Sequence, residues 1–349
     1  MAEETIRAMT DRGFGFMMIR SAIVALAVLT AAFSGIVPGV NAPPTIHGVV
    51  ATTIRVGTST NGPLGIPANP YPPATSMHNL YSLQPGHPAY VLAMTFRVEA
   101  LAASPHGRYI ALAEGEQGLW IVNSAGTSLH RLLPVPIRST GQSHVAISAV
   151  AWSPDRYILA YAVNDTAGVS TDGRLGIWTV RYDGGSPRHL LAGARYAAVS
   201  LSWSSDGRTT LAAGLREGLV GIDAATGRTH VLVAGSIDRG SGPQYPAFAP
   251  AGVALAYVVR RFSPSGPTSD LYLIDAEGRR PRIIVQTRND ISAPVWAPDG
   301  RSIAYVWRSD VMAASGPPPD IHAVDLATGS AHVLVQGALT TYGYVTNFV

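Results

Sequence analysis

A short pattern recurs five times along the chain and limits its possible folds more than any other sequence feature. In its fullest form it is an apolar stretch ending in Trp, an Ala/Ser-Pro-Asp-Gly turn and a second apolar stretch ending in Ala-Tyr. The copies occupy residues 102–112, 151–161, 202–213, 247–257 and 295–305. The Trp position recurs at intervals of 49, 51, 45 and 48 residues, at Ala103, Trp152, Trp203, Phe248 and Trp296. Such intervals are typical of four-stranded β-propeller blades.

A second shared pattern follows each copy and completes the unit. It is an alternating apolar strand, then a polar turn that ends in Gly, at 118–126, 176–184, 218–227, 270–278 and 320–329. A short apolar strand such as His-Val-Leu-Val at 230–233 comes next. Alternating apolar residues predict half-buried strands, so each unit should contain four strands, here lettered A to D.

The first turn of each unit joins strands A and B. Pro fixes φ early in the turn, and Gly accepts the left-handed conformation at its end. We expect Asp155, Asp206 and Asp299 to accept hydrogen bonds from backbone amides within these turns, which is a structural role. The Trp before the turn is expected to fill the space between neighbouring blades.

The two ends of the repeat region each hold part of one further unit. Residues 79–93 have the spacing of strands C and D without a turn motif before them, and residues 341–348 look like a lone strand A. Phe348 lies 52 residues after Trp296, which fits the repeat interval. We therefore expect a sixth blade with strands at 342–349, 49–56, 80–83 and 90–93. The predicted fold is an all-β, six-bladed β-propeller over 43–349 whose C-terminal strand closes the N-terminal blade and leaves no open sheet edge.

The combined pattern Trp-[Ser/Ala]-Pro-Asp-Gly-x-x-Ile-Ala-Tyr, followed by Ile-x-x-[Val/Ile]-Asp-x-x-x-Gly, resembles the TolB-like, WD-related repeat of bacterial envelope proteins. The resemblance covers about 300 residues. It implies a propeller, but similar repeats occur in envelope scaffolds, peptidase accessory domains and sugar-processing enzymes, so it leaves the function open. The copies depart from the pattern at Ala103, His106, Arg156 and 248–251. The resemblance is to the repeat and not to the whole of TolB, whose α/β domain finds no room in this length.

Residues 1–42 are expected to form a leader with a hydrophobic helix. Residues 21–37 are uncharged and mostly apolar, follow Arg20, and would make a helix about 26 Å long. The segment fits a cleaved signal peptide and a retained membrane anchor equally well, and either would export the remainder. We therefore expect the propeller to be extracytoplasmic, and either secreted or anchored to the cytoplasmic membrane by this helix.

Composition excludes several classes of protein. The net charge is only +3 and no long basic run occurs, so a nucleic acid is not an expected partner. The absence of cysteine excludes disulfides and thiolate metal sites. A serine hydrolase is excluded because the chain has no Gly-x-Ser-x-Gly motif. No motif predicts a cofactor, and none is expected.

The connections between strands indicate where a ligand would bind. In a propeller the B–C and D–A connections share one face, here called the loop face. The B–C connections are short at 114–118 and 216–218 but long at 58–78, 164–174, 260–269 and 308–319. Long connections on a rigid scaffold commonly carry binding sites. The residues entering the axial end of strand A should line the mouth of the central channel, and we expect a ligand there to contact Arg138, His144, Tyr196, Tyr245, Asp290 and Tyr342.

Two other groups of polar residues contain side chains that can bind metals. His130, His189, His230 and His332 fall near the start of strand D in different blades, on the outer rim and too far apart to share a metal. Asn164, Asp165 and Asp172 share a loop and offer the oxygen ligands that calcium prefers. Their spacing differs from that of an EF-hand, and self-capping turns are the favoured interpretation, so no metal site is expected.

The leading functional hypothesis is a non-catalytic, extracytoplasmic propeller whose loop face binds a protein, peptide or glycan of the cell envelope. The alternative is an enzyme acting on a carbohydrate or lactone at the channel mouth, with Asp290 and His144 as acid and base and tyrosines as stacking groups. A sensor ectodomain is a third hypothesis, but residues 1–18 are too few for a cytoplasmic domain.

Overall fold

The computed structural model describes residues 49–51, 78–82, 90–95 and 98–335. The last range has gaps at 106, 124–125, 137–143, 155–156, 166, 168–169, 194–197, 199, 208, 215–217, 236–241, 264–265 and 310–319. Within these residues no helix is long and apolar enough to cross a membrane. The apolar segment 21–37 and the closing strand predicted at 342–349 lie outside the described residues.

The described residues form 23 strands, all in antiparallel sheets. One sheet has three strands: β1 (Val49–Ala51), β2 (His78–Ser82) and β3 (Tyr90–Thr95). Five sheets have four strands and are called blades one to five. Blade one holds β4 (Ala100–Ala103), β5 (Tyr109–Ala113), β6 (Leu119–Asn123) and β7 (His130–Leu133). Blade two holds β8 (Val145–Trp152), β9 (Ile158–Asp165), β10 (Gly176–Arg181) and β11 (Arg188–Ala192).

The remaining three blades follow the same strand order. Blade three holds β12 (Leu201–Trp203), β13 (Thr209–Gly214), β14 (Gly218–Asp223) and β15 (Thr229–Val233). Blade four holds β16 (Gly242–Phe248), β17 (Ala254–Ser263), β18 (Gly266–Asp275) and β19 (Arg282–Thr287). Blade five holds β20 (Asp290–Trp296), β21 (Ser302–Arg308), β22 (Asp320–Asp325) and β23 (Ala331–Val335).

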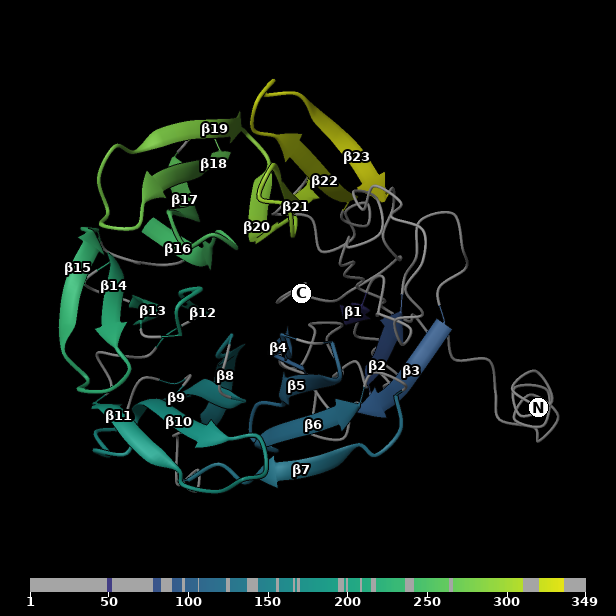
Figure 1. Cartoon of the computed structure of the whole chain (residues 1–349), viewed down its shortest axis with the longest axis vertical. Helices are drawn as coiled ribbons and strands as arrows, with labels where there is room; N and C mark the ends of the chain where they lie inside the picture. The colour runs from purple at the N-terminus through teal and green to yellow at the C-terminus, as the bar shows by residue number, and fades with distance from the viewer. Residues whose placement is uncertain are drawn as a thin grey trace, which may run out of the picture.

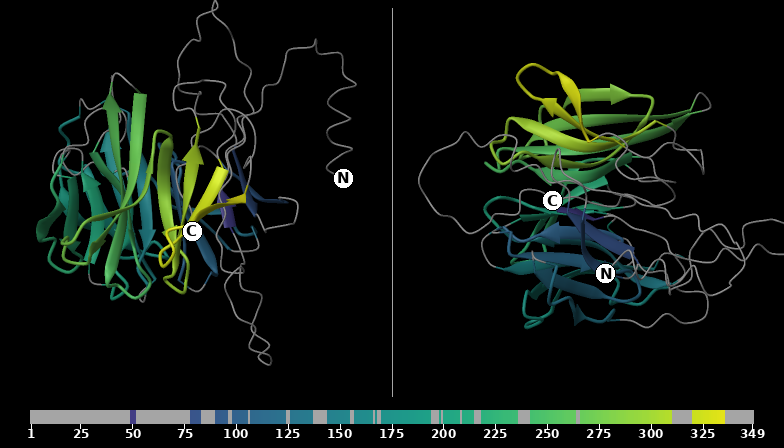
Figure 2. Two further views of the ribbon diagram at one scale, coloured as in Figure 1. Left: turned by 90° about the horizontal axis from the view of Figure 1, so that it is seen from above. Right: turned by 90° about the vertical axis from the view of Figure 1, so that its right-hand side faces the viewer.

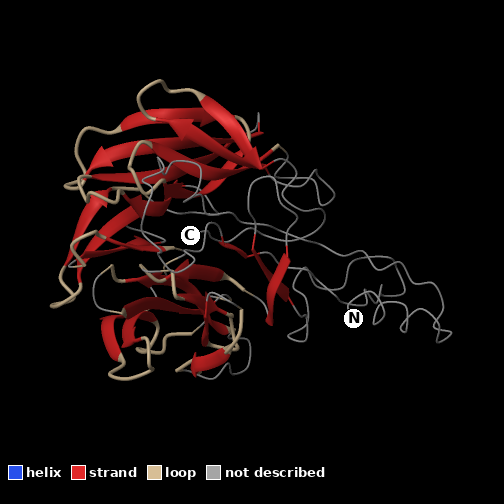
Figure 3. Cartoon of the chain, turned by 45° about the vertical axis from the view of Figure 1, so that its right-hand side comes forward, coloured by secondary structure: helices blue, strands red, loops and turns tan. Residues whose placement is uncertain are grey.

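The sheets are arranged around a central axis, with the first strand of each blade innermost and the fourth on the rim (Figure 1). In the side views the sheets stand next to one another around this axis (Figure 2). The described elements are all strands and loops (Figure 3). The prediction of an all-β propeller is confirmed. The strands expected around 49–56, 80–83 and 90–93 pair as neighbours, with Val50 opposite Tyr81 and Leu80 opposite Ala93. The closure that would complete their sheet involves residues outside the described ones.

The core lies between adjacent blades and not inside any one of them. Apolar side chains of blade one, such as Ile121, pack with Trp152 and Tyr161 of blade two. Blades four and five form a similar layer that includes Leu271 and Tyr305. Because both faces of an inner strand are covered, strand β9 is buried at almost every position instead of at alternate ones.

The tryptophans of the repeat connect successive blades. Trp152 Nε1 donates a hydrogen bond to the Ala102 carbonyl (2.8 Å), Trp203 Nε1 to Ala151 (3.1 Å) and Trp296 Nε1 to Ala247 (2.9 Å). In each case the acceptor directly precedes the Trp position of the preceding blade. The predicted place of these tryptophans between neighbouring blades is confirmed, and one repeated contact sets how each blade packs on the previous one.

The A–B turns have the predicted chemistry with one variation. Gly300 has φ of 70° and donates to the Ala297 carbonyl (2.9 Å), which closes the turn. Asp299 Oδ1 accepts a bond from the Arg301 amide (3.0 Å), as expected. In the equivalent turn of blade three, Asp206 Oδ1 accepts a bond from the Ser204 hydroxyl (2.5 Å). Asp155 lies outside the described residues.

The prediction of a long loop at 260–269 is wrong. Strands β17 and β18 continue through this segment, with Arg260 opposite Ser269 and Ser263 opposite Gly266. The sequence here is polar and lacks the apolar alternation that indicates a strand, but Ser-Pro-Ser-Gly at 263–266 is a turn sequence that lets the ladder run on. Blade four therefore extends its central hairpin where a loop was expected.

Candidate ligand-binding face

Segments far apart in sequence meet on the loop face of blades one and two. His144 Nδ1, in the connection between the blades, lies 3.3 Å from Glu116 Oε1 of the blade one B–C turn. The His144 amide also donates to Asp165 Oδ1 at the end of β9 (2.8 Å). These contacts join three connections, as expected if the B–C and D–A segments share a face.

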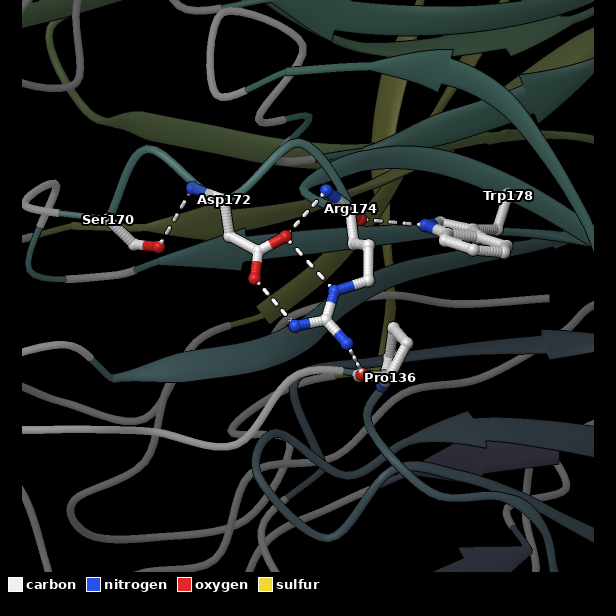
Figure 4. Close-up of polar contacts among 5 residues, drawn as sticks. All are labelled: Pro136, Ser170, Asp172, Arg174 and Trp178. Atoms are coloured by element: carbon white, nitrogen blue, oxygen red, sulfur yellow. Dashed lines mark hydrogen bonds and ion pairs between the residues drawn. The ribbon is translucent and has the colours of Figure 1, made fainter.

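A bidentate ion pair fixes the end of the blade two B–C connection (Figure 4). Asp172 accepts hydrogen bonds from Arg174 N (2.8 Å), Nε (3.0 Å) and Nη2 (2.7 Å). These bonds from Arg174 lower the pKa of the Asp172 carboxyl to about 2. Arg174 Nη1 also donates to the Pro136 carbonyl in the connection that follows blade one (3.2 Å), and Trp178 Nε1 donates to the Arg174 carbonyl (2.9 Å). The arginine thus links two blades at the surface.

The acidic residues of this connection serve as turn caps. Asp165 Oδ1 accepts from the Ala167 amide (3.1 Å), and Oδ2 accepts from the Ser170 amide (2.7 Å). Asn164 Nδ2 donates to the Ser148 hydroxyl (2.6 Å) and to the Ala198 carbonyl (3.0 Å). The self-capping interpretation is confirmed for Asp165 and Asp172. In the part of the chain that is described, no group of three or more His, Asp or Glu is arranged to hold a metal ion.

A second set of polar contacts lies on the loop face of blades four and five, around Arg260. Its Nε is 2.6 Å from Asp290 Oδ1, and Nη2 donates to Asp290 Oδ2 (2.8 Å). The guanidinium carbon also lies 5.2 Å from the centre of the Tyr245 ring, within the range of a cation–π contact. Only 19% of the Arg260 side chain and 9% of the Asp290 side chain are exposed. This bidentate pair connects the second strand of one blade to the first strand of the next.

A bulge in β16 orients Tyr245 toward Arg260. The register of β16 against β17 shifts between Gln244 and Ala247, and Tyr245 has φ of 52°. A left-handed conformation is unfavourable for a residue with a side chain, at about 1–3 kcal/mol. The Tyr245 amide, freed from the ladder, donates to the Ser200 hydroxyl of blade three (3.1 Å). The innermost strands of three blades therefore meet at this point.

Asp290 should make the stability of the protein depend on pH. Burial raises the pKa of its carboxyl above the ordinary value, although the charges of Arg260 and Arg308 and hydrogen bonds from Arg260 and Ser269 lower it. The folded state therefore holds this proton more tightly than the unfolded state. The stabilisation that comes from the bound proton is complete below about pH 4, the pKa in the unfolded chain, and is lost as the pH rises through the raised pKa of the folded state.

We expect the free energy of unfolding of the wild type, relative to Asp290→Asn, to fall from pH 4 to pH 7. Urea unfolding at each pH measures this difference. Asp299→Asn, in an exposed turn, is the matched control. A difference between wild type and Asp290→Asn that stays constant with pH would contradict the prediction.

The structure describes three of the six residues predicted at the channel mouth. Tyr245 and Asp290 both contact Arg260, so they are brought together. His144 lies exposed in the contacts of blades one and two. The other predicted residues lie outside the described ones: Arg138, Tyr196 and Tyr342. That any of the six binds a ligand stays a prediction.

Sequence reasoning missed Arg260 because it placed this residue in a loop. The charge pattern of the hairpin, an Arg-Arg pair on one strand followed by an aspartate on the next, indicates the contact of Arg261 with Asp270 and not that of Arg260 with Asp290. The four rim histidines do lie in the outermost strands, and His189 stacks on Trp178 with ring centres 4.1 Å apart.

Part of the chain is similar in sequence to TolB proteins. Over 82 residues the chain is 36% identical to the Tol-Pal system protein TolB of Aromatoleum aromaticum and 33% identical to that of Marinomonas sp.. The matched segment is 24% of this chain and only 17% and 18% of those relatives. The chain is a TolB-like β-propeller. No protein-family model matches it.

Solved structures show the same fold over more of the TolB-like chain. The putative TolB from Agrobacterium tumefaciens matches with a TM-score of 0.52 and 20% identity, over 71% of this chain and 84% of that one. TolB from Acinetobacter baumannii matches with a TM-score of 0.54 and 14% identity, over 92% of this chain and 65% of that one. An oligogalacturonate lyase in complex with manganese matches with a TM-score of 0.50 and 13% identity, over 90% of this chain and 85% of that one. At these identities the likeness concerns the fold alone.

Proposed function

We propose that this TolB-like propeller is a non-catalytic, extracytoplasmic protein that binds a protein or peptide partner through its loop face. The observation that carries the proposal is the set of contacts that hold this face in place. Glu116, His144 and Arg174 connect segments from different blades. A surface ordered before binding loses less conformational entropy on association, which favours recognition. The relatives' name, which places TolB in the Tol-Pal system, supports a protein partner over a glycan.

The enzyme hypothesis receives no support from the described geometry. It needs Asp290 as an acid or base, yet both carboxylate oxygens of Asp290 face the guanidinium of Arg260. It also pairs Asp290 with His144, which instead lies beside Glu116 and Asp165. We therefore propose binding alone for this face.

The extracytoplasmic location and the closure of the ring belong to the same proposal. The apolar segment 21–37 supports export, and sequencing of the mature N-terminus by mass spectrometry tests whether it is cleaved. We also propose six blades, with residues 342–349 as the innermost strand beside β1. Sheet β1–β3 has three strands where each other sheet has four, and Phe348 continues the repeat interval.

Photo-crosslinking from the two faces tests the binding proposal. A photoreactive amino acid is placed at Glu116, Gly173 or Ala234 on the loop face, and at exposed C–D turn positions on the opposite face as matched controls: Ala225, Glu277 and Ala327. Gly173 suits this purpose because an added Cβ meets no atom within 4 Å. We expect one protein adduct, identical in mass, from the loop-face positions only. Equal adducts from both faces, or none from the loop face of the protein in its native cell, would refute the proposal.

A further inference from the structure

An open groove of about 500 Å³ lies between the outer strand of blade three and the sheet of blade four. It opens at the loop face, where β15 ends and β16 starts, and extends along the side of blade four to Pro281 in the C–D connection. Its lining is mainly apolar and aromatic, and includes Val233, Pro243, Tyr257, Val259, Tyr272 and Pro281. The rings of Tyr257 and Tyr272 stack with centres 5.2 Å apart and planes at 17°. The groove is thus large enough for several side chains of a ligand and offers a mainly apolar floor.

The charge presented in this groove is positive. Arg261 lines the groove, and 51% of its side chain is exposed, whereas the carboxylate that it contacts, Asp270, is 2% exposed. Arg261 Nη1 donates to Asp270 Oδ2, and Nη2 donates to the Tyr272 hydroxyl (3.1 Å). A guanidinium has five N–H donors, so donors remain on its exposed side for an anionic ligand. The aspartate and the tyrosine fix the position of the arginine from beneath.

The fold itself does not require a carboxylate at the position of Asp270. Blade five has Asp320 at this point of the repeat, and blades one to three have glycine, namely Gly118, Gly176 and Gly218. An added Cβ there would lie 2.0–2.3 Å from a carbonyl oxygen of the next strand. Blade four instead buries a charged side chain, which is unfavourable unless a partner compensates it. The Asp320 side chain is 20% exposed and lies beside His322 (3.8 Å), whereas Asp270 is buried and holds an exposed arginine, which fits a role in recognition.

We propose that this groove binds an extended peptide segment in which an acidic residue stands two positions from an apolar one. The inference rests on the proposed function and names the chemistry of the partner. Three residues of β17 stand at alternate positions and share one face, so that successive ones are about 7 Å apart: Arg261, Val259 and Tyr257. Side chains two positions apart on an extended peptide have the same spacing. The acidic side chain accepts charge-assisted hydrogen bonds from Arg261, and the apolar one covers Val259 and the stacked tyrosines.

A defined peptide tests the groove directly. The probe is acetyl-Glu-Ser-Leu-Ser-Phe-amide, with the Gln-for-Glu peptide as its control, and binding to the full chain is followed by ligand-observed NMR titration. We expect saturable binding of the Glu peptide and about tenfold weaker binding of the Gln peptide, a factor that corresponds to about 1.4 kcal/mol. Arg261→Gln should weaken binding of the Glu peptide by the same factor. Arg282→Gln, an exposed arginine on the other face of the same sheet, should leave binding unchanged.

Two further variants cover the case in which Arg261→Gln unfolds the chain by leaving Asp270 without its partner. Arg261→Gln/Asp270→Asn removes both charges, and Ala234→Trp fills the groove from its exposed rim without touching the ion pair. Each folded variant should no longer bind the Glu peptide. Unchanged binding in a folded variant, equal binding of the Gln peptide, or binding of a neutral oligosaccharide in place of the peptide would overturn the inference. Loop-face crosslinks from Gly173 that persist in those variants would leave the proposed function standing.

Discussion

Replacing Trp152 with alanine should destabilise the protein by about 3–5 kcal/mol, the usual cost of removing a large aromatic side chain from a packed core. Trp152 is 7% exposed and packs among residues of blades one and two. Its Nε1 also donates to the Ala102 carbonyl of the preceding blade (2.8 Å). The substitution therefore leaves a cavity and removes a hydrogen bond at the boundary between two blades.

Urea unfolding followed by circular dichroism measures the effect. Trp152→Phe, which keeps much of the ring volume and loses the hydrogen bond, should cost only about 1–2 kcal/mol. The matched control is Trp178→Ala, since Trp178 is half-buried in β10 and its indole bonds within its own blade. If Trp152→Ala and Trp178→Ala cost the same, the packing of Trp152 between blades would not be what stabilises the ring.

The repeat was sufficient to predict the blades because each is specified by local chemistry. Trp296, the turn that ends at Gly300 and the alternating strand that follows occur together, and the same order recurs in the other units. The prediction of a loop at 260–269 failed for the opposite reason. Its extra ladder pairs, such as Arg261 with Thr268, are polar and have no apolar alternation, so a period-based argument assigns them to a loop.

The candidate sites were harder to predict, because they depend on contacts between blades. Tyr245 and Asp290 were chosen as residues entering strand A, but the sequence does not reveal that Arg260 joins them from another strand. The bulge that orients Tyr245 leaves no mark in the sequence, since its φ of 52° occurs at a residue that rarely adopts it. The groove beside Arg261 depends likewise on how blade three packs against blade four.

Deleting residues 342–349 should lower the free energy of unfolding by about 3–6 kcal/mol, if they supply the missing innermost strand of sheet β1–β3. The estimate assumes that two of the strand's apolar side chains, Phe348 among them, are buried at about 1.5–3 kcal/mol each. The deletion would also leave β1 as an unpaired edge. Hydrogen exchange of the Val49–Ala51 amides should therefore accelerate together with the loss of stability.

A point substitution and a peptide make this test specific. Phe348→Ala should reproduce about half of the loss, whereas Asn347→Ala, whose side chain would project from the other face of the strand, should cost less than about 1 kcal/mol. A synthetic peptide of residues 338–349 added to the truncated chain should restore the stability, and the same peptide with alanine at 348 should not. If the truncated chain unfolds at the wild-type urea concentration and Val49–Ala51 exchange at the wild-type rate, the ring is closed by another contact and the count of six blades fails.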